Sequence, residues 1–191
     1  TRGGTPPRIW VFLFFFVSGA TGLIYEVVWT RLLTLVMGNT HYSIATVLTA
    51  FMGGLALGSY AGGKVIDRRF NPLAAYAFLE LGIGLYCLII PGLIDFAFPL
   101  FKWVYLNWGD SYTQASMIRF SICVAILIVP ATFMGATLPV LSKFVSRDKA
   151  HIGKDVGTLY SINTFGAVFG AWASAFIFMR LWGVQSTIIC V

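Results

Sequence analysis

The sequence is poor in charge, in histidine and in cysteine. Charged residues make up 10% of the 191 residues, whereas about 25% is usual in a soluble domain. That is too little charge to cover the surface of a soluble fold. The three cysteines, Cys87, Cys123 and Cys190, have no CxxC spacing, so neither a zinc site nor a disulfide framework is indicated.

The sequence is rich in long apolar stretches. About 20 apolar residues are needed for a helix to cross the hydrocarbon core of a membrane. Five stretches reach that length: Ile9–Thr30, His41–Gly63, Pro72–Ile94, Ala115–Leu141 and Val156–Met179. We predict an all-α membrane protein, a polytopic helical bundle that forms one transmembrane domain over residues 1–191.

A sixth apolar run begins at Val184 and reaches only Val191. The prediction is therefore five full spans and the start of a sixth. The first residue is Thr1 rather than Met. Together these features lead us to expect a piece of a longer protein.

A catalytic set of side chains is not visible in the pattern. The two histidines, His41 and His151, fall on opposite sides of the predicted membrane, which argues against a paired-histidine metal site. Serine and threonine are scattered through the spans without a base beside them. We expect no catalytic residue, no metal and no cofactor in this chain.

The basic residues predict the orientation in the membrane. Nine of the thirteen lie before span one, after span two or after span four: Arg2, Arg8, Lys64, Arg68, Arg69, Lys143, Arg147, Lys149 and Lys154. The positive-inside rule makes these regions, and hence the N-terminus, cytoplasmic, as in a multi-pass protein of the bacterial inner membrane. Because the basic residues follow span ends and form no contiguous face, we expect contact with lipid headgroups and no nucleic-acid partner.

The segment between spans three and four, Asp95–Gln114, is aromatic and moderately polar. Its apolar part is too short to cross a membrane, so we predict that it lies along the outer interface. An aromatic belt touching lipid is the favoured interpretation, and a partner-binding surface is the alternative.

Two ladders of small residues predict how the helices pack. Gly54, Gly58 and Gly62 recur every four residues in span two, and span five has the same spacing in Gly166, Gly170 and Ser174. Small residues on one helical face let a second backbone approach closely. Their places in the second and fifth spans are consistent with two three-helix repeats, as in a major facilitator half.

The stretch AFLELGIGLY, Ala77–Tyr86, has an acidic residue followed by two glycines, as some nucleotide sites do. The third glycine of the GxGxxG pattern is missing, and the stretch lies inside one apolar run, so a nucleotide site is not favoured. Glu80 remains as a carboxylate in a membrane span. It is either a functional site facing the bundle interior or a structural group bonded to Tyr76 or a neighbouring helix.

Glu26 is the second intramembrane carboxylate, about 25 Å along span one from Ile9. It differs from Glu80 in depth by about 13 Å, which is too far for a direct acid–base pair. A structural ion pair is preferred over a substrate contact for Glu26. The candidate partners are Arg31, Arg119 and His41.

Four ordered motifs carry a family resemblance. They are GLIYEVVWTRLL (22–33), TVLTAFMGGLALGSYAGGKVIDR (46–68), GATLPVLSKF (135–144) and GTLYSINTFGAVFGA (157–171). Together they resemble the membrane region of bacterial fused major facilitator/spermidine synthase-like proteins. The resemblance implies a soluble synthase-like domain elsewhere in the protein, absent from these residues, to which any aminopropyl transfer and its ligands would belong.

The loop after span two also resembles the corresponding loop of major facilitator transporters. Asp67 and Arg68 stand where that loop has its Asp-Arg pair, although Phe70 and Pro72 depart from its usual continuation. A conformational latch is what the resemblance implies, and a basic cytoplasmic anchor is the alternative.

Three functions therefore compete at the level of sequence. The first is a membrane module that anchors a cytoplasmic domain and handles a small cationic substrate. The second is a non-catalytic accessory or scaffold subunit among other membrane subunits, suggested by the aromatic segment. The third is half of a transporter resembling the major facilitator superfamily.

Overall fold

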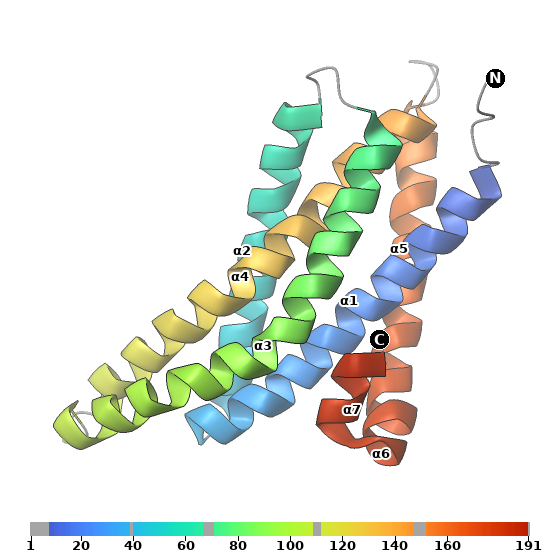
Figure 1. Cartoon of the computed structure of the whole chain (residues 1–191). Coiled ribbons are helices and arrows are strands. Elements are labelled where there is room, and N and C mark those ends of the chain that lie inside the picture. The colour runs from blue at the N-terminus through green and yellow to red at the C-terminus, as the bar shows by residue number, and fades with distance from the viewer. Residues whose placement is uncertain (1–7, 39, 67–70, 109–111, 147–151, 191) are drawn as a thin grey trace.

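The computed structural model describes residues 8–38, 40–66, 71–108, 112–146 and 152–190. Its architecture is a bundle of long helices (Figure 1). These are α1 (Arg8–Met37), α2 (Thr40–Ile66), α3 (Pro72–Trp108), α4 (Tyr112–Val145) and α5 (Ile152–Ala173). A π-helical turn, η2 (Ser174–Phe178), then leads to the short helices α6 (Met179–Leu181) and α7 (Gly183–Cys190).

Five segments in the described ranges are long and apolar enough to cross a membrane. No strand occurs among these residues, so the predicted all-α bundle is confirmed. The ends of α2 and α4 and the beginnings of α3 and α5 lie together at one end of the bundle (Figure 1). This end carries Lys64, Lys143 and Lys154 and is called the basic end below.

Helix α3 is longer than predicted. It continues without a break from Ile94 to Trp108, in place of a separate segment along the interface. Ala97, Phe101 and Val104 are buried at helical spacing, so this part has an apolar face of its own. Pro91 and Pro99 lie inside the helix, and each removes a backbone hydrogen bond. The ribbon of α3 bends away from α1 in its second half (Figure 1).

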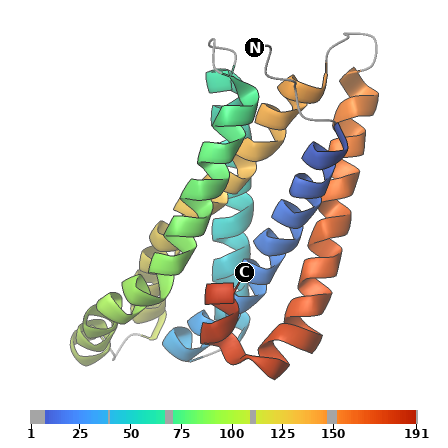
Figure 2. The ribbon, with the colours of Figure 1, turned by 45° about the vertical axis from the view of Figure 1, so that its right-hand side comes forward.

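Two helix pairs make the most extensive contacts. Helix α2 packs along α4, and α1 packs along α5, as Figure 2 shows for α1 and α5. Helix α3 also packs along α4, but it touches α1 over a much smaller surface. The region between α1 and α3 is therefore a loosely packed part of the bundle.

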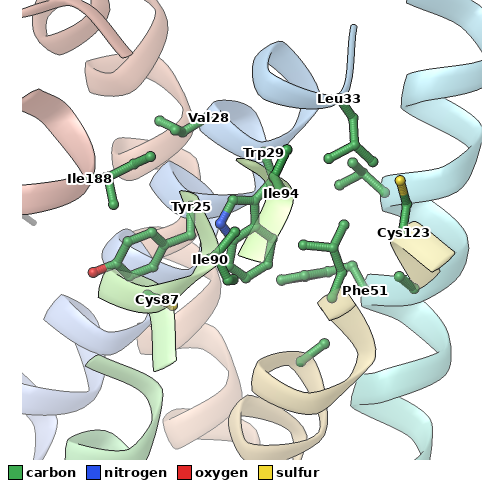
Figure 3. Close-up of a cluster of buried hydrophobic side chains, with 14 of the residues drawn as sticks. Tyr25, Val28, Trp29, Leu33, Phe51, Cys87, Ile90, Ile94, Cys123 and Ile188 are labelled. Atoms are coloured by element: carbon green, nitrogen blue, oxygen red, sulfur yellow. The ribbon is translucent and has the colours of Figure 1, made fainter. Parts of the chain in front are cut away.

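One buried apolar cluster joins most of the helices (Figure 3). Trp29 of α1 is its largest fully buried side chain and stacks on Tyr25, with ring centroids 5.8 Å apart. Ile188 of α7 is 2% exposed and belongs to the same cluster. Gly183 has a φ of 74°, a value that favours glycine, and α7 then packs against α1 and α3.

Candidate functional site

Glu80 lies on α3, two turns after the helix begins at Pro72. Its half-buried carboxylate faces α1 and accepts a hydrogen bond of 2.6 Å at Oε1 from Ser18 Oγ. Tyr76, one turn earlier on α3, is 8% exposed and is a second side-chain hydrogen-bond partner of this carboxylate. The structure thus combines the two partners expected for a structural carboxylate, the tyrosine at i−4 and a neighbouring helix.

A cavity of about 550 Å³ lies beside this carboxylate, between α1 and α3. We call it the Glu80 groove. Its polar lining comes from Ser18, Thr21, Tyr25, Tyr76 and Glu80. The rest of the wall is apolar or glycine, including Trp10, Phe14, Ala77 and Ile83. Glu80 is therefore not sealed among side chains.

A second cavity, of about 340 Å³, continues past Glu80 toward α7. It shares Tyr25, Glu80 and Gly84 with the Glu80 groove and is bounded by Ile188. The carboxylate consequently stands at the junction of two spaces. An elongated ligand lying along α3 would pass it midway.

The chemistry of the lining suits an organic cation. A carboxylate is an acceptor for ammonium donors, and hydroxyl groups accept further hydrogen bonds. Apolar walls favour methylene groups, and a few convergent polar groups in an apolar cavity are typical of small-molecule sites. The arrangement can hold an alkylamine, with its nitrogen at Glu80 and its carbon chain along the apolar walls.

The two glycines that follow Glu80 have different surroundings. A Cβ placed on Gly82 would meet the Phe133 ring at 3.3 Å, so Gly82 is a packing position. A Cβ on Gly84 would meet nothing within 4 Å, and Gly84 lines both cavities. The stretch 77–86 is helical throughout, so it lacks the strand–turn–helix context that a nucleotide site requires.

Glu26 lies on α1, about two turns beyond the Glu80 partner Ser18, and is half-buried. In the described part of the chain, the hydrogen bond at Glu26 involves its backbone oxygen, which accepts from Thr30 Oγ1 at 2.9 Å. No salt bridge or hydrogen bond of its carboxylate occurs among these residues. Pairing with Arg31, Arg119 or His41 therefore stays a prediction. Asp67 and Arg68, the proposed latch residues, lie outside the described residues.

The predicted ladder glycines lie where backbones come close. A Cβ on Gly54 would fall 2.4 Å from the Ala131 Cβ of α4, and one on Gly58 would fall 1.9 Å from the Thr132 oxygen. A Cβ on Gly62 would be 2.9 Å from the Ala136 Cβ. Such distances leave no room for a side chain.

Helix α5 approaches α1 in the same way. A Cβ on Gly166 would be 2.0 Å from the Phe16 oxygen, and one on Gly170 would be 2.1 Å from the Ala20 oxygen. Ser174, the third member of this ladder, is fully buried. It begins the π-helical turn, in which the Met179 N–H bonds to the Ser174 oxygen.

Three contributors to these contacts were missed by the sequence analysis. Ser18 gave no signal, because a serine in an apolar helix commonly bonds its own backbone. Asn163 of α5 donates to the Phe15 oxygen of α1 at 3.1 Å, and its polarity inside a span was a usable signal. Gly135 of α4 faces the Leu55 backbone, and its four-residue spacing from Ala131 was a usable signal.

Comparison with known proteins gives two distant relatives. The chain is 26% identical over 172 residues to Polyamine aminopropyltransferase 2 of Streptomyces coelicolor, which covers 88% of the chain and 29% of the relative. Polyamine aminopropyltransferase 1 of the same organism is 26% identical over 171 residues, or 89% of the chain and 28% of the relative. The chain thus spans less than a third of either relative. No family model and no solved structure matches it.

Proposed function

We propose that this chain is the membrane module of a spermidine synthase-like protein, that it anchors a cytoplasmic domain, and that its Glu80 groove binds a small organic cation. The helices that can span a membrane support the first part, together with the similarity to polyamine aminopropyltransferases over most of the chain. The groove supports the last part, because it places an intramembrane carboxylate beside open space.

The single observation that carries the binding role is the position of Glu80. A carboxylate in hydrocarbon is costly, about 2.5 kcal/mol or more on insertion scales. A purely structural carboxylate avoids part of this cost by being enclosed among hydrogen-bond donors. Glu80 has partners at Ser18 and Tyr76 and yet also borders two cavities. The open side is where a cationic ligand would neutralise the charge.

Binding of 1,4-diaminobutane to the purified full chain in lipid nanodiscs tests this role. We expect the parent to bind the diamine and Glu80→Gln to weaken binding about tenfold or more, since a hydrogen bond to a charged group contributes about 1.5–3 kcal/mol. The matched control is Glu26→Gln, which removes the other intramembrane carboxylate and should keep the parental affinity.

The neutral analogue 1,4-butanediol distinguishes charge recognition from filling of an apolar space. It should bind much more weakly than the diamine. Equal affinities of the parent and Glu80→Gln for the diamine would contradict the proposal. Equal affinities of the parent for the diamine and the diol would contradict it too.

The anchoring role requires the basic end to face the cytoplasm, as the distribution of lysine and arginine suggests. Lys154 and Asn107 are exposed at opposite ends of the bundle. In intact cells, Lys154→Cys should be protected from a membrane-impermeant thiol reagent, whereas Asn107→Cys should react. The unsubstituted protein gives the background labelling. The reverse pattern would place the basic end outside and rule out a cytoplasmic domain there.

A transporter half is the second candidate, and the helix pairing favours it. In two three-helix repeats, α1 corresponds to α4, and α2 corresponds to α5. The pair α1–α5 then corresponds to the pair α4–α2. These are the two most extensive helix pairs. In each pair the second helix of its repeat supplies the ladder glycines. Uptake of labelled diamine into proteoliposomes would distinguish transport from binding alone.

A further inference from the structure

A second groove lies on the other side of α3, between α3 and α2. Helix α4 packs against both α2 and α3. Helices α2 and α3 share few contacts with each other, so they are separated. The space between them is a cavity of about 460 Å³. Its α2 side is lined by Gly58, Ala61, Gly62 and Val65. We call it the α2–α3 groove.

The composition of this groove calls for a hydrocarbon ligand. Thr132 of α4 is the one lining residue with a polar side chain. Its Oγ1 already donates to the Ile128 oxygen at 2.7 Å, so it does not require a polar partner. Phe78 and Leu79 of α3 and Val140 of α4 supply large apolar surfaces. This groove therefore differs sharply from the Glu80 groove, which has a carboxylate and several hydroxyl groups.

The shape of the groove follows from the glycine ladder. Gly58 and Gly62 have no side chains, and they let the α2 backbone lie close to α4. At these two positions no side chain projects from α2 into the groove. Ala61 of α2 and Ala75 of α3 are small as well, and both line the walls. The result is a channel along α4 with α2 and α3 as its sides.

The groove leads toward the basic end of the bundle. Lys143 follows Val140 by three positions, so it lies on the same face of α4 one turn further along. It is exposed, as is Lys64, which follows Gly62 on α2. Lys64 is directed elsewhere, because it donates to the Tyr60 hydroxyl and lies 4.2 Å from the centroid of that ring, and Tyr60 does not line the groove. A negatively charged group at the mouth of the groove would meet Lys143, one turn beyond Val140.

We propose that the α2–α3 groove is a binding site for an anionic phospholipid of the surrounding membrane, with one acyl chain along α4 and the headgroup near Lys143. The apolar lining matches the acyl chain, and the basic end, which carries Lys143, matches the charge of the headgroup. Basic residues near a membrane surface attract anionic lipid by about 1 kcal/mol each. The site is independent of Glu80 and of any diamine bound there.

Native mass spectrometry of the full chain in mild detergent tests the proposal. The protein is titrated with phosphatidylglycerol or phosphatidylcholine carrying identical acyl chains. Ala61→Phe and Ala75→Phe fill the groove from two different helices and should each reduce phosphatidylglycerol binding about tenfold. The matched control is Ala56→Phe, at an exposed position on α2 that does not line the groove, and it should bind as the parent does.

The headgroup contact has its own variant. Lys143→Gln should lower the affinity for phosphatidylglycerol about fivefold, the equivalent of about 1 kcal/mol, and leave phosphatidylcholine binding unchanged. Circular dichroism establishes that each variant is folded, and the use of two filling variants guards against misfolding of one.

Three results would overturn the proposal. One is that the filling variants and Ala56→Phe retain phosphatidylglycerol equally. Another is that the parent binds both lipids with the same affinity. The third is that Ala61→Phe changes the oligomeric mass without changing lipid retention, which would make the groove a contact between two copies of the chain.

Discussion

The α2–α4 contact is close and extensive, whereas the α1–α3 contact is sparse. Between α2 and α4, glycines bring the backbones together, and a Cβ on Gly58 would lie 1.9 Å from the Thr132 oxygen. Between α1 and α3, contact is sparse, and the hydrogen bond from Ser18 to Glu80 crosses a region that also contains a cavity of about 550 Å³. The first contact can set the positions of the helices, whereas the second leaves room for a ligand.

This difference has a physical basis. In a bilayer the lipid tails are as apolar as leucine, so helix association depends on close packing and interhelical hydrogen bonds more than on burial of apolar surface. Helices without small residues at their contact stay apart and leave space between them. Helix α3 has no ladder of small residues facing α1, and both large grooves described above lie along its sides.

The largest effect is expected from breaking the close contact. Gly58→Leu places a side chain where the Thr132 backbone now lies, and overpacking costs about 1–3 kcal/mol and occasionally more; contact with backbone puts this site at the upper end. The folded yield in detergent, measured by size-exclusion chromatography, should fall severely. Gly53→Leu in the same helix is the control, because a Cβ there would meet nothing within 4 Å, and its yield should match the parent. Equal yields from the two variants would show that the contact does not hold the helices together.

A smaller effect is expected at the sparse contact. Ser18→Ala removes the hydrogen bond to Glu80, and interhelical hydrogen bonds in membranes contribute about 0.6 kcal/mol, with a maximum near 1.7 kcal/mol. The free energy of unfolding should fall by that amount in a denaturation series. Thr21→Val is the matched control, since Thr21 Oγ1 bonds the Ser18 oxygen of its own helix at 3.0 Å. A loss for Ser18→Ala as large as that for Gly58→Leu would erase the distinction between the two regions.

Much of the fold was predictable because it depends on properties of single segments. Span number and position follow from apolar length, and the predicted spans lie within helices α1 to α5 or their direct continuation. The exception is α3, whose second half was taken for an interfacial segment because its hydropathy drops after Ile94. Burial of Ala97, Phe101 and Val104 on one helical face explains the continuation. The spacing of these three residues in the sequence already has the helical period.

The candidate site was predictable only in part. The position of Glu80 inside a span marked it as a candidate, because a carboxylate in hydrocarbon is rare and costly. Its partner Ser18 lies 62 residues away. The sequence gives no signal for this pairing, because one serine in an apolar helix has many possible partners. Glu26 met the same criterion as Glu80, yet it borders neither of the two cavities beside Glu80.

By itself the sequence determined that the chain is helical, that it can cross a membrane five times, and that its basic residues gather at one end. Those properties depend on apolar length, on residue spacing and on charge along the chain. Only the tertiary structure decided that Gly82 packs against Phe133 while Gly84 opens onto the Glu80 groove. It also decided that α3 has a polar groove on one side and an apolar groove on the other. The physical reason is that a cavity is formed by side chains distant in sequence, and the packing of helices on one another sets which of them meet.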